Sequence, residues 1–332
     1  MPLLRINATP QGFALHDPGQ SARLLIARPG TGTGPVIIML HGYKYAPSTH
    51  AHCPHHKIFG TGPRSWPRAL GFDTGDPQEG LGIALGWYAR GPLARVHRRA
   101  RDLGGSLATI ISLLRASAPE RPVHIIAHSM GSEAALSALE HLPAGAVDRI
   151  VLLTGASFAG RAQEMLRTPA GRRTEVFNIT SRENDLFDMA FERLVPREIP
   201  ADHAIGRGIS APNACTLQLD CARTLDALSA LDLPIGAPSR RICHWSAYTR
   251  PGVMALYTQL LRTPDKLPSG LLRSALPVNT APRWSRLFAG GGTGTGRSGT
   301  ASALPAMPLA LRVKNRIMAG TQARGKNNEH AC

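Results

Sequence analysis

The chain has 332 residues, of which 43% are hydrophobic, and a formal net charge of +16. This length suits one large domain or two ordinary ones, and the apolar content is ample for a sizeable core. Five sparse cysteines without a CxxC spacing argue against a disulfide framework and a zinc ribbon. No stretch approaches the roughly 20 apolar residues that span a bilayer, and the N-terminus lacks the apolar core of a signal peptide, so we expect a cytoplasmic protein.

Short apolar runs alternate along the chain with segments of helical period. The expected strands are 3–7 and 23–27, which form an N-terminal hairpin or two edge strands, then 35–40, 81–88, 123–127, 148–155 and 174–180, with a short strand at 241–245. The expected helices are 93–116, one that begins near 130, 160–167, 224–231 and 253–262. This alternation predicts an α/β domain, with a mainly parallel central sheet that helices cover on both faces.

Two long segments and a tail interrupt this pattern. We expect one domain over 1–275, in which the irregular segments 43–80 and 189–238 lie near the active-site rim. Residues 276–332 are basic, rich in Gly, Ser and Thr, and are expected to be disordered. No cluster of Lys and Arg is interleaved with aromatic residues, so we expect no nucleic-acid partner. Contact of the basic tail with an acidic membrane surface is a weaker hypothesis, and the sequence does not predict the oligomeric state.

Ser129 lies between the expected strand 123–127 and the helix that follows. The residues around it, Ala127-His128-Ser129-Met130-Gly131, match the nucleophile-elbow pattern with Ala in the first glycine position. Such a turn holds the serine in a strained conformation, so the residues two positions away on either side must be small. At a helix N-terminus the backbone N–H groups favour negative charge that develops beside the serine hydroxyl. An ordinary turn with an idle serine is the alternative.

A serine nucleophile needs a base, and the base needs an orienting acid. Asp185 follows the strand 174–180, and His244 lies in the last short strand. Loops at the carboxyl ends of parallel strands share one edge, so these residues are expected to converge on Ser129. Their order along the chain is Ser, Asp, His. The competing residues are Glu183 and Asp188 for the acid and His203 for the base, while the neighbouring His128 is expected to have a structural role.

With these features the chain resembles the α/β-hydrolase superfamily, and more narrowly bacterial lipases and esterases, over roughly residues 20–270. The resemblance rests on Leu40-His41-Gly42-Tyr43, on the Ser129 pattern, on Asn184-Asp185 and on His244. It implies that Ser129 is the nucleophile, His244 the general base and Asp185 the residue that orients the base. It also implies an oxyanion hole formed by the backbone N–H groups of Tyr43 and Met130.

The sequence from 49 to 56 places four histidines and Cys53 close together. They are numerous enough to ligate zinc, but their spacing matches no ligand scheme, so we expect no metal and no cofactor. Trp87, Trp245 and Tyr248 lie near strand ends and are candidates for the wall of an acyl pocket, with ordinary core packing as the alternative.

These observations favour a serine hydrolase that cleaves a carboxylic ester, or less readily an amide or thioester, through an acyl-enzyme intermediate. The expected partner is therefore a small-molecule acyl substrate. Two alternatives remain on the same fold: a catalytically silent binding protein and an acyltransferase.

Overall fold

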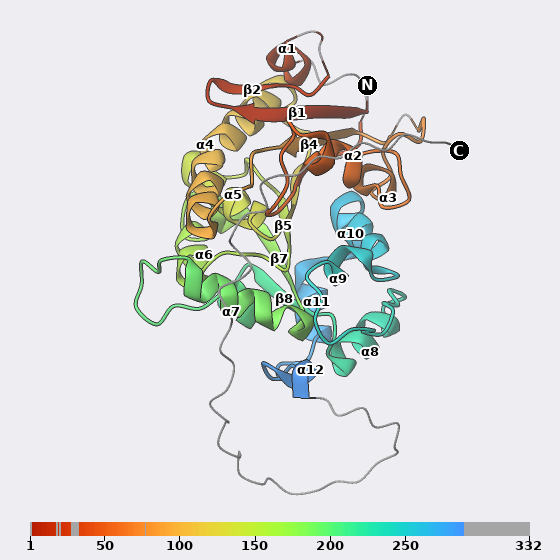
Figure 1. Ribbon diagram of the computed structural model, residues 1–332. Coiled ribbons are helices and arrows are strands. Elements are labelled where there is room, and N and C mark those ends of the chain that lie inside the picture. The colour runs from red at the N-terminus through yellow and green to blue at the C-terminus, as the bar shows by residue number, and fades with distance from the viewer. Residues whose placement is uncertain (1, 18, 20, 28–32, 77, 289–332) are drawn as a thin grey trace, which may run out of the picture. The chain divides into compact units, whose positions relative to one another are not determined.

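The computed structural model describes residues 2–17, 19, 21–27, 33–76 and 78–288. Its centre is an eight-stranded sheet with the strand order β2-β1-β4-β3-β5-β6-β7-β8 (Figure 1). Only the pair of β1 and β2 is antiparallel, and every other neighbouring pair is parallel. The strands are β1 (Leu3–Thr9), β2 (Gly12–Leu15), β3 (Val36–Leu40), β4 (Leu81–Gly86), β5 (Val123–His128), β6 (Arg149–Leu153), β7 (Glu175–Thr180) and β8 (Ala214–Gln218).

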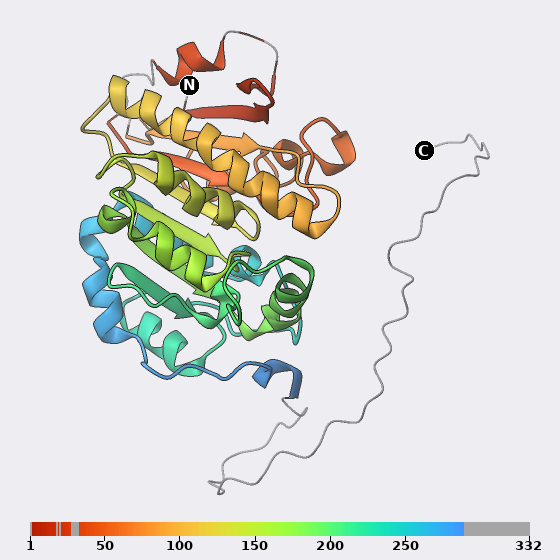
Figure 2. The same ribbon diagram turned by 90° about the vertical axis from the view of Figure 1, so that its left-hand side faces the viewer.

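Helices cover both faces of this sheet, which confirms the predicted fold class. Figures 1 and 2 show α4 and α5 on one face, while α10 lies on the opposite side. The helices are α1 (Ala22–Ile26), α2 (Pro54–Lys57), α3 (Trp66–Ala69), α4 (Leu93–Ser117), α5 (Gly131–Ala138), α6 (Ala159–Met165), α7 (Asp185–Leu194), α8 (Ala222–Ala230), α9 (Ser246–Thr249), α10 (Val253–Arg262), α11 (Ser269–Ala275) and α12 (Ser285–Phe288).

The central strands are mostly apolar because both of their faces are buried. Successive side chains of β3 alternate between two cores: Ile38 and Leu40 pack with the α4 and α5 side chains, whereas Ile37 and Met39 pack with Trp66 and the α10 side chains. This placement of the central strands brings the carboxyl ends of β3, β5, β6 and β7 to one edge, where the loops that carry Gly42, Ser129, Thr154 and Asn184 begin.

The prediction for the N-terminal region was partly wrong. Residues 3–7 form β1 as expected, but its hairpin partner is β2, and the segment 23–27 that was expected to be a strand lies in the helix α1. The apolar residues Ala22 and Ile26 are buried. They are about one helical turn apart, so both side chains lie on the buried face of a helix, whereas the short apolar run alone is equally compatible with a strand.

The segment 189–238 also holds more structure than expected. It contains the end of α7 and the edge strand β8, which were not expected, and the helix α8, which confirms the helix expected at 224–231. The short strand expected at 241–245 does not form, and His244 instead lies in a loop that leads into α9. The strand β8 has only five residues, which is too short to give a clear periodic pattern.

The compact unit continues past the expected boundary near 276 and includes α12. The Arg283 side chain pairs with Glu192 at 3.0 Å, and the Trp284 backbone N–H donates to Asp185 at 2.6 Å, so this segment is tied to α7. The expected disorder of the remaining tail concerns residues 289–332, which lie outside the described residues.

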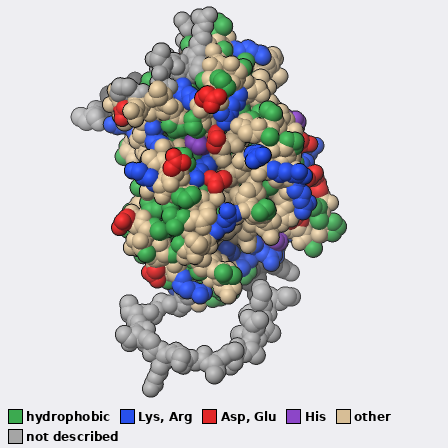
Figure 3. Space-filling model, turned by 180° about the vertical axis from the view of Figure 1, so that it is seen from behind, with side chains coloured by type: hydrophobic (Ala, Val, Ile, Leu, Met, Phe, Trp, Pro, Cys, Tyr) green, Lys and Arg blue, Asp and Glu red, His purple; other side chains and the backbone are tan. Residues whose placement is uncertain are grey.

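Two features concern the surface of the described residues. None of their helices has both the length and the apolar character needed to cross a membrane. Basic, acidic and hydrophobic side chains are interspersed on the face opposite to that of Figure 1 (Figure 3).

Candidate active site

Ser129 occupies the sharp turn between β5 and α5. Its φ is 53°, in the left-handed region that a residue with a Cβ rarely adopts. The Ser129 backbone N–H donates to the Leu153 carbonyl, and the Ala156 N–H donates to the Ser129 carbonyl, both at 3.0 Å. The neighbouring strand β6 and the loop after it therefore hold the strained conformation, as expected where strain serves a function.

Glycines on both sides of the turn allow the close packing around Ser129. A Cβ on Gly42 would lie 2.6 Å from the Ser129 Cβ, and one on Gly131 would lie 2.7 Å from the His41 carbonyl oxygen. Neither position has room for a methyl group, whereas Ala127 fits in the strand with its side chain fully buried. The loop after β3 is thus pressed directly against the serine turn.

Gly42→Ala is expected to lower kcat/KM for ester hydrolysis by about 100-fold or more, because a displaced loop loses its oxyanion contact. The matched control is Gly62→Ala in the same long segment, where an added Cβ would meet no atom within 4 Å. Steady-state kinetics on both purified variants measure the effect. Full activity of Gly42→Ala would contradict a role for this loop at the serine.

Two backbone N–H groups lie beside the serine turn with no acceptor of their own. Among the described residues, neither the Tyr43 N–H nor the Met130 N–H donates a hydrogen bond. His41 holds the first of these loops in place: its Nδ1–H donates to the Gly42 carbonyl at 2.9 Å, and its Nε2 accepts from the Trp87 N–H at 3.0 Å. Burial lowers the pKa of His41 to about 3, so it stays neutral and keeps this role.

His244 lies next to the serine turn and is anchored through its backbone. The His128 Nε2–H and the Thr154 hydroxyl donate to the His244 carbonyl, at 3.1 and 3.3 Å. The rings of His128 and His244 are 4.6 Å apart. His128 therefore has the structural role that was expected. Burial lowers the pKa of His244 well below its ordinary value, which keeps the imidazole unprotonated at neutral pH.

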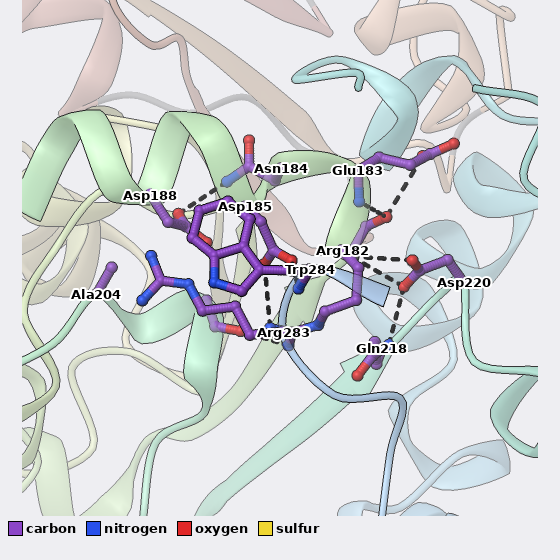
Figure 4. A network of polar contacts seen from close by, with 12 residues as sticks. Arg182, Glu183, Asn184, Asp185, Asp188, Ala204, Gln218, Asp220, Arg283 and Trp284 are labelled. Atoms are coloured by element: carbon purple, nitrogen blue, oxygen red, sulfur yellow. Dashed lines mark hydrogen bonds and ion pairs between the residues drawn. The ribbon is translucent and has the colours of Figure 1, made fainter. Parts of the chain in front are cut away.

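The residue that orients His244 is Asn184 rather than Asp185, which corrects the expectation for the acid. The His244 Nδ1–H donates to Asn184 Oδ1 at 2.6 Å. The Asp185 carboxylate instead accepts from Arg182 at 3.2 Å and from the Trp284 N–H. A 3₁₀ turn over Arg182–Asn184 follows β7, and Asp185 begins α7, so the two neighbouring side chains point in different directions (Figure 4).

Asp188 fixes the orientation of the Asn184 side-chain amide. The Asn184 Nδ2 donates to Asp188 Oδ1 at 2.8 Å, so the amide oxygen is the atom presented to His244 (Figure 4). A Cβ on Gly206 would lie 2.0 Å from Asp188 Oδ2, so this glycine makes room for the carboxylate. His244, Asn184 and Asp188 thus form a continuous chain of hydrogen bonds, and two of its members were not among the leading sequence candidates.

Asp188 is also expected to make stability depend on pH. Burial, and next the nearby Asp185 carboxylate, raise its pKa from 3.8 to about 7. The folded state then holds a proton that the unfolded state releases, so this contribution is complete below about pH 4 and is lost as the pH rises to about 7. Asp188→Asn removes the effect and keeps an acceptor for Asn184. Denaturant unfolding at pH 5 and pH 8 should show wild type losing about 2 to 3 kcal/mol more than the variant. Equal losses would contradict a raised pKa.

The other candidates for the acid and the base lie elsewhere. The Glu183 carboxylate pairs with Arg250 at 2.5 Å, and the His203 Nδ1–H donates to the Ala204 carbonyl at 3.1 Å. The structure thus brings Ser129, His244 and the Tyr43 and Met130 amides to one place. Ser129 and His244 form no direct side-chain hydrogen bond in the described structure, and such contacts often tighten only when substrate binds.

A cavity of about 980 Å³ is lined by the chain neighbours of His244, Cys243 and Trp245, but neither His244 nor Ser129 lines it. Trp245 and Tyr248 line it, whereas Trp87 is buried with its ring stacked on His41. Phe187, which the sequence did not single out, stacks on the His244 ring at 4.7 Å and is 37% exposed. Among the described residues, one group of side chains has the donor atoms and closeness for a metal ion: His16, Cys53 and His56.

Residues 98–157 match a family described as alpha/beta hydrolase of unknown function (DUF900). A comparison with curated proteins finds no match. Solved structures with a similar fold include a Bacillus licheniformis lipase, BlEst2 in mature form (14% identity, 61% of this chain and 86% of that chain, TM-score 0.31). A Trichoderma reesei cutinase is also similar (16% identity, 47% and 72%, TM-score 0.23). A third is the phospholipase PlaB from Legionella pneumophila (12% identity, 72% and 62%, TM-score 0.34).

The family match spans most of α4, the strand β5, the serine turn, α5 and β6. The α/β-hydrolase fold requires three features that are present here: the order of the strands, the strained conformation of Ser129 and the close packing of the Gly42 loop. The chain therefore has an α/β-hydrolase fold, and the segment that carries Ser129 matches an alpha/beta hydrolase family.

Proposed function

We propose that the protein is a serine hydrolase that cleaves carboxylic esters through an acyl-enzyme intermediate. The observation that carries this proposal is the left-handed Ser129 at the start of α5, pressed against Gly42 and flanked by two backbone N–H groups without acceptors. A strained, buried serine in such surroundings has no evident structural purpose. It suits a hydroxyl that attacks a carbonyl carbon whose oxygen becomes negative.

In the proposed acylation, the Ser129 hydroxyl oxygen bonds to the ester carbonyl carbon and its proton passes to His244 Nε2. The Tyr43 and Met130 N–H groups stabilise the resulting oxyanion. The bond to the leaving alcohol then breaks, and the His244 proton goes to that alcohol. In deacylation a water takes the place of the alcohol: His244 accepts its proton and the water oxygen bonds to the acyl carbon. The bond from that carbon to the Ser129 oxygen then breaks, this oxygen recovers the proton from His244, and the carboxylic acid leaves.

Asn184 and Asp188 would act as positioning residues in this scheme. The amide oxygen of Asn184 accepts from His244 Nδ1–H, which leaves Nε2 as the basic nitrogen. Since Asp188 accepts from the amide nitrogen, the amide cannot turn over without losing a buried hydrogen bond. A neutral amide stabilises the imidazolium less than a carboxylate does, and the Asp188 carboxyl behind it supplies part of the difference above about pH 7, where it is ionised.

The acyl chain is expected to contact the apolar side chains around His244. Phe187 and Trp245 are both substantially exposed beside the imidazole of His244, which places apolar surface next to the proposed base.

A series of nitrophenyl esters with acyl chains of increasing length tests the proposal. We expect a rapid burst of about one equivalent of nitrophenol, where deacylation is slower than acylation, followed by steady turnover. Absence of turnover for every member of the series, with protein shown to be folded by circular dichroism, would overturn it.

A further inference from the structure

The fold brings three metal-ligand side chains together at the N-terminal end of the sheet. His16 follows β2, Cys53 precedes α2, and His56 lies in α2. Their ligand atoms all lie within 4.8 Å of one another. His16 lies far from the other two in sequence, so the group arises only when the hairpin of β1 and β2 meets the segment 43–80.

The spacing of the donor atoms suits a tetrahedral ion. The His16 Nε2 lies 3.8 Å from the Cys53 Sγ. With usual zinc–sulfur and zinc–nitrogen bond lengths, a nitrogen and a sulfur on the same tetrahedral ion are about 3.5 Å apart. An ion can therefore bind with shifts of a few tenths of an ångström. His56 is exposed, so the fourth position is open to solvent.

A second layer of side chains orients His16. The Asn7 Nδ2 donates to His16 Nδ1 at 3.2 Å, and the His55 Nε2–H donates to Asn7 Oδ1 at 2.8 Å. The His55 ring also stacks on that of His16 at 4.1 Å. Metal ligands of this kind are typically held through their second ring nitrogen by a polar group. With an ion on Nε2, the proton of His16 moves to Nδ1 and the Asn7 amide turns over to present its oxygen. His55 then takes the tautomer with its proton on Nδ1, so that its Nε2 accepts from the Asn7 amide nitrogen.

The donor set selects the class of ion. One thiolate and two imidazoles favour zinc and similar borderline-soft divalent ions over magnesium or calcium, which prefer oxygen ligands. The Cys53 thiol releases its proton to solvent when it binds. We propose that His16, Cys53 and His56 bind one divalent ion, zinc or a similar borderline-soft metal, which links the segment 43–80 to the β1–β2 hairpin.

This site lies close to the loop that packs on Ser129. A Cβ on Gly86 would lie 2.6 Å from Asn7 Oδ1 and 2.7 Å from His55 Nε2. The next residue, Trp87, holds His41 and therefore the Gly42 loop. The ion would stabilise the part of the chain that supports this loop without touching the reacting atoms.

Titration of the metal-free full-length protein with Zn²⁺ and with Co²⁺, under a reductant that does not bind metal, tests the proposal. We expect one tight equivalent, a thiolate-to-cobalt absorption band, and a melting temperature about 5 °C higher at 100 times the dissociation constant. Cys53→Ser should lose the band, and His16→Ala and His56→Ala should weaken binding at least 10-fold.

His52→Ala is the matched control, because His52 lies in the same loop but outside the group of three. It should bind the ion as wild type does. His56 is exposed, so its variant should stay folded even if the buried Cys53 does not tolerate substitution. The proposal is overturned if wild type binds no equivalent, or if tight binding survives in His56→Ala or His16→Ala and so arises elsewhere.

Discussion

Ser129→Ala is expected to lower kcat for ester hydrolysis by about 10⁶-fold and to abolish covalent labelling by a fluorophosphonate probe. Loss of a triad serine has an effect of this size because the acyl-enzyme route then disappears entirely. The small rate that remains comes from substrate binding and from oxyanion stabilisation by the Tyr43 and Met130 amides. Labelling followed by mass spectrometry of the peptide that contains Ser129 measures the outcome.

Ser132→Ala is the matched control for this result. Ser132 lies on the same turn, but its hydroxyl donates to the Ala127 carbonyl at 3.3 Å and is fully buried. It should keep its labelling and most of its activity. Labelling of the Ser129→Ala protein, or no labelling of folded wild type, would contradict the assignment of the nucleophile.

The parts of the fold that could be predicted are those with a strong and uninterrupted pattern. The buried strands around 36–40 and 123–128 are continuous apolar runs, and α10 occupies 253–262 as its spacing predicts. The serine turn was also predictable, because only small residues fit around Ser129 and the chain has Ala127 and Gly131 there. In each case the predicted feature depends only on the size or the spacing of residues that are close together in the sequence.

The features that were missed depend on a geometry that cannot be inferred from residues adjacent in the sequence. Whether Asn184 or Asp185 faces His244 is decided by one 3₁₀ turn after β7, which rotates the chain between two neighbouring polar side chains. The preference for an acid in such triads favoured Asp185. The signal that was available is the i, i+4 spacing of Asn184 and Asp188, which places both side chains on one face of a helical turn.

The group formed by His16, Cys53 and His56 illustrates the same limit at long range. The stretch 49–56 contains many ligand types, yet only two of them join the group. The third ligand comes from the hairpin, and the pairing of β1 with β4 in the sheet brings it near. No spacing rule within the stretch itself predicts this arrangement.

Asn184→Ala is expected to lower kcat by about 10³- to 10⁴-fold with a small change in KM. In serine proteases a triad residue that fails to hold the correct histidine tautomer has an effect of this order. The matched control is Asp185→Asn, which keeps acceptors for Arg182 and for the Trp284 N–H and should stay within a few-fold of wild type. If Asp185→Asn loses activity and Asn184→Ala keeps it, the original assignment to Asp185 is correct.

The double variant Asn184→Asp with Asp188→Asn distinguishes two roles of Asn184: orienting the His244 imidazole and supporting the fold. In wild type the amide nitrogen of Asn184 and the carboxylate of Asp188 are joined at 2.8 Å. In the exchanged protein the new carboxylate at 184 accepts from both the amide at 188 and His244 Nδ1–H, so every hydrogen bond survives and the charge moves next to the imidazole. We expect kcat at least equal to that of wild type, because the imidazolium gains a direct ionic partner. Asn184→Ala combined with Asp188→Asn keeps no acceptor for His244 and should stay inactive. If the exchanged protein is as inactive as this second double variant, then Asn184 supports the fold rather than the base.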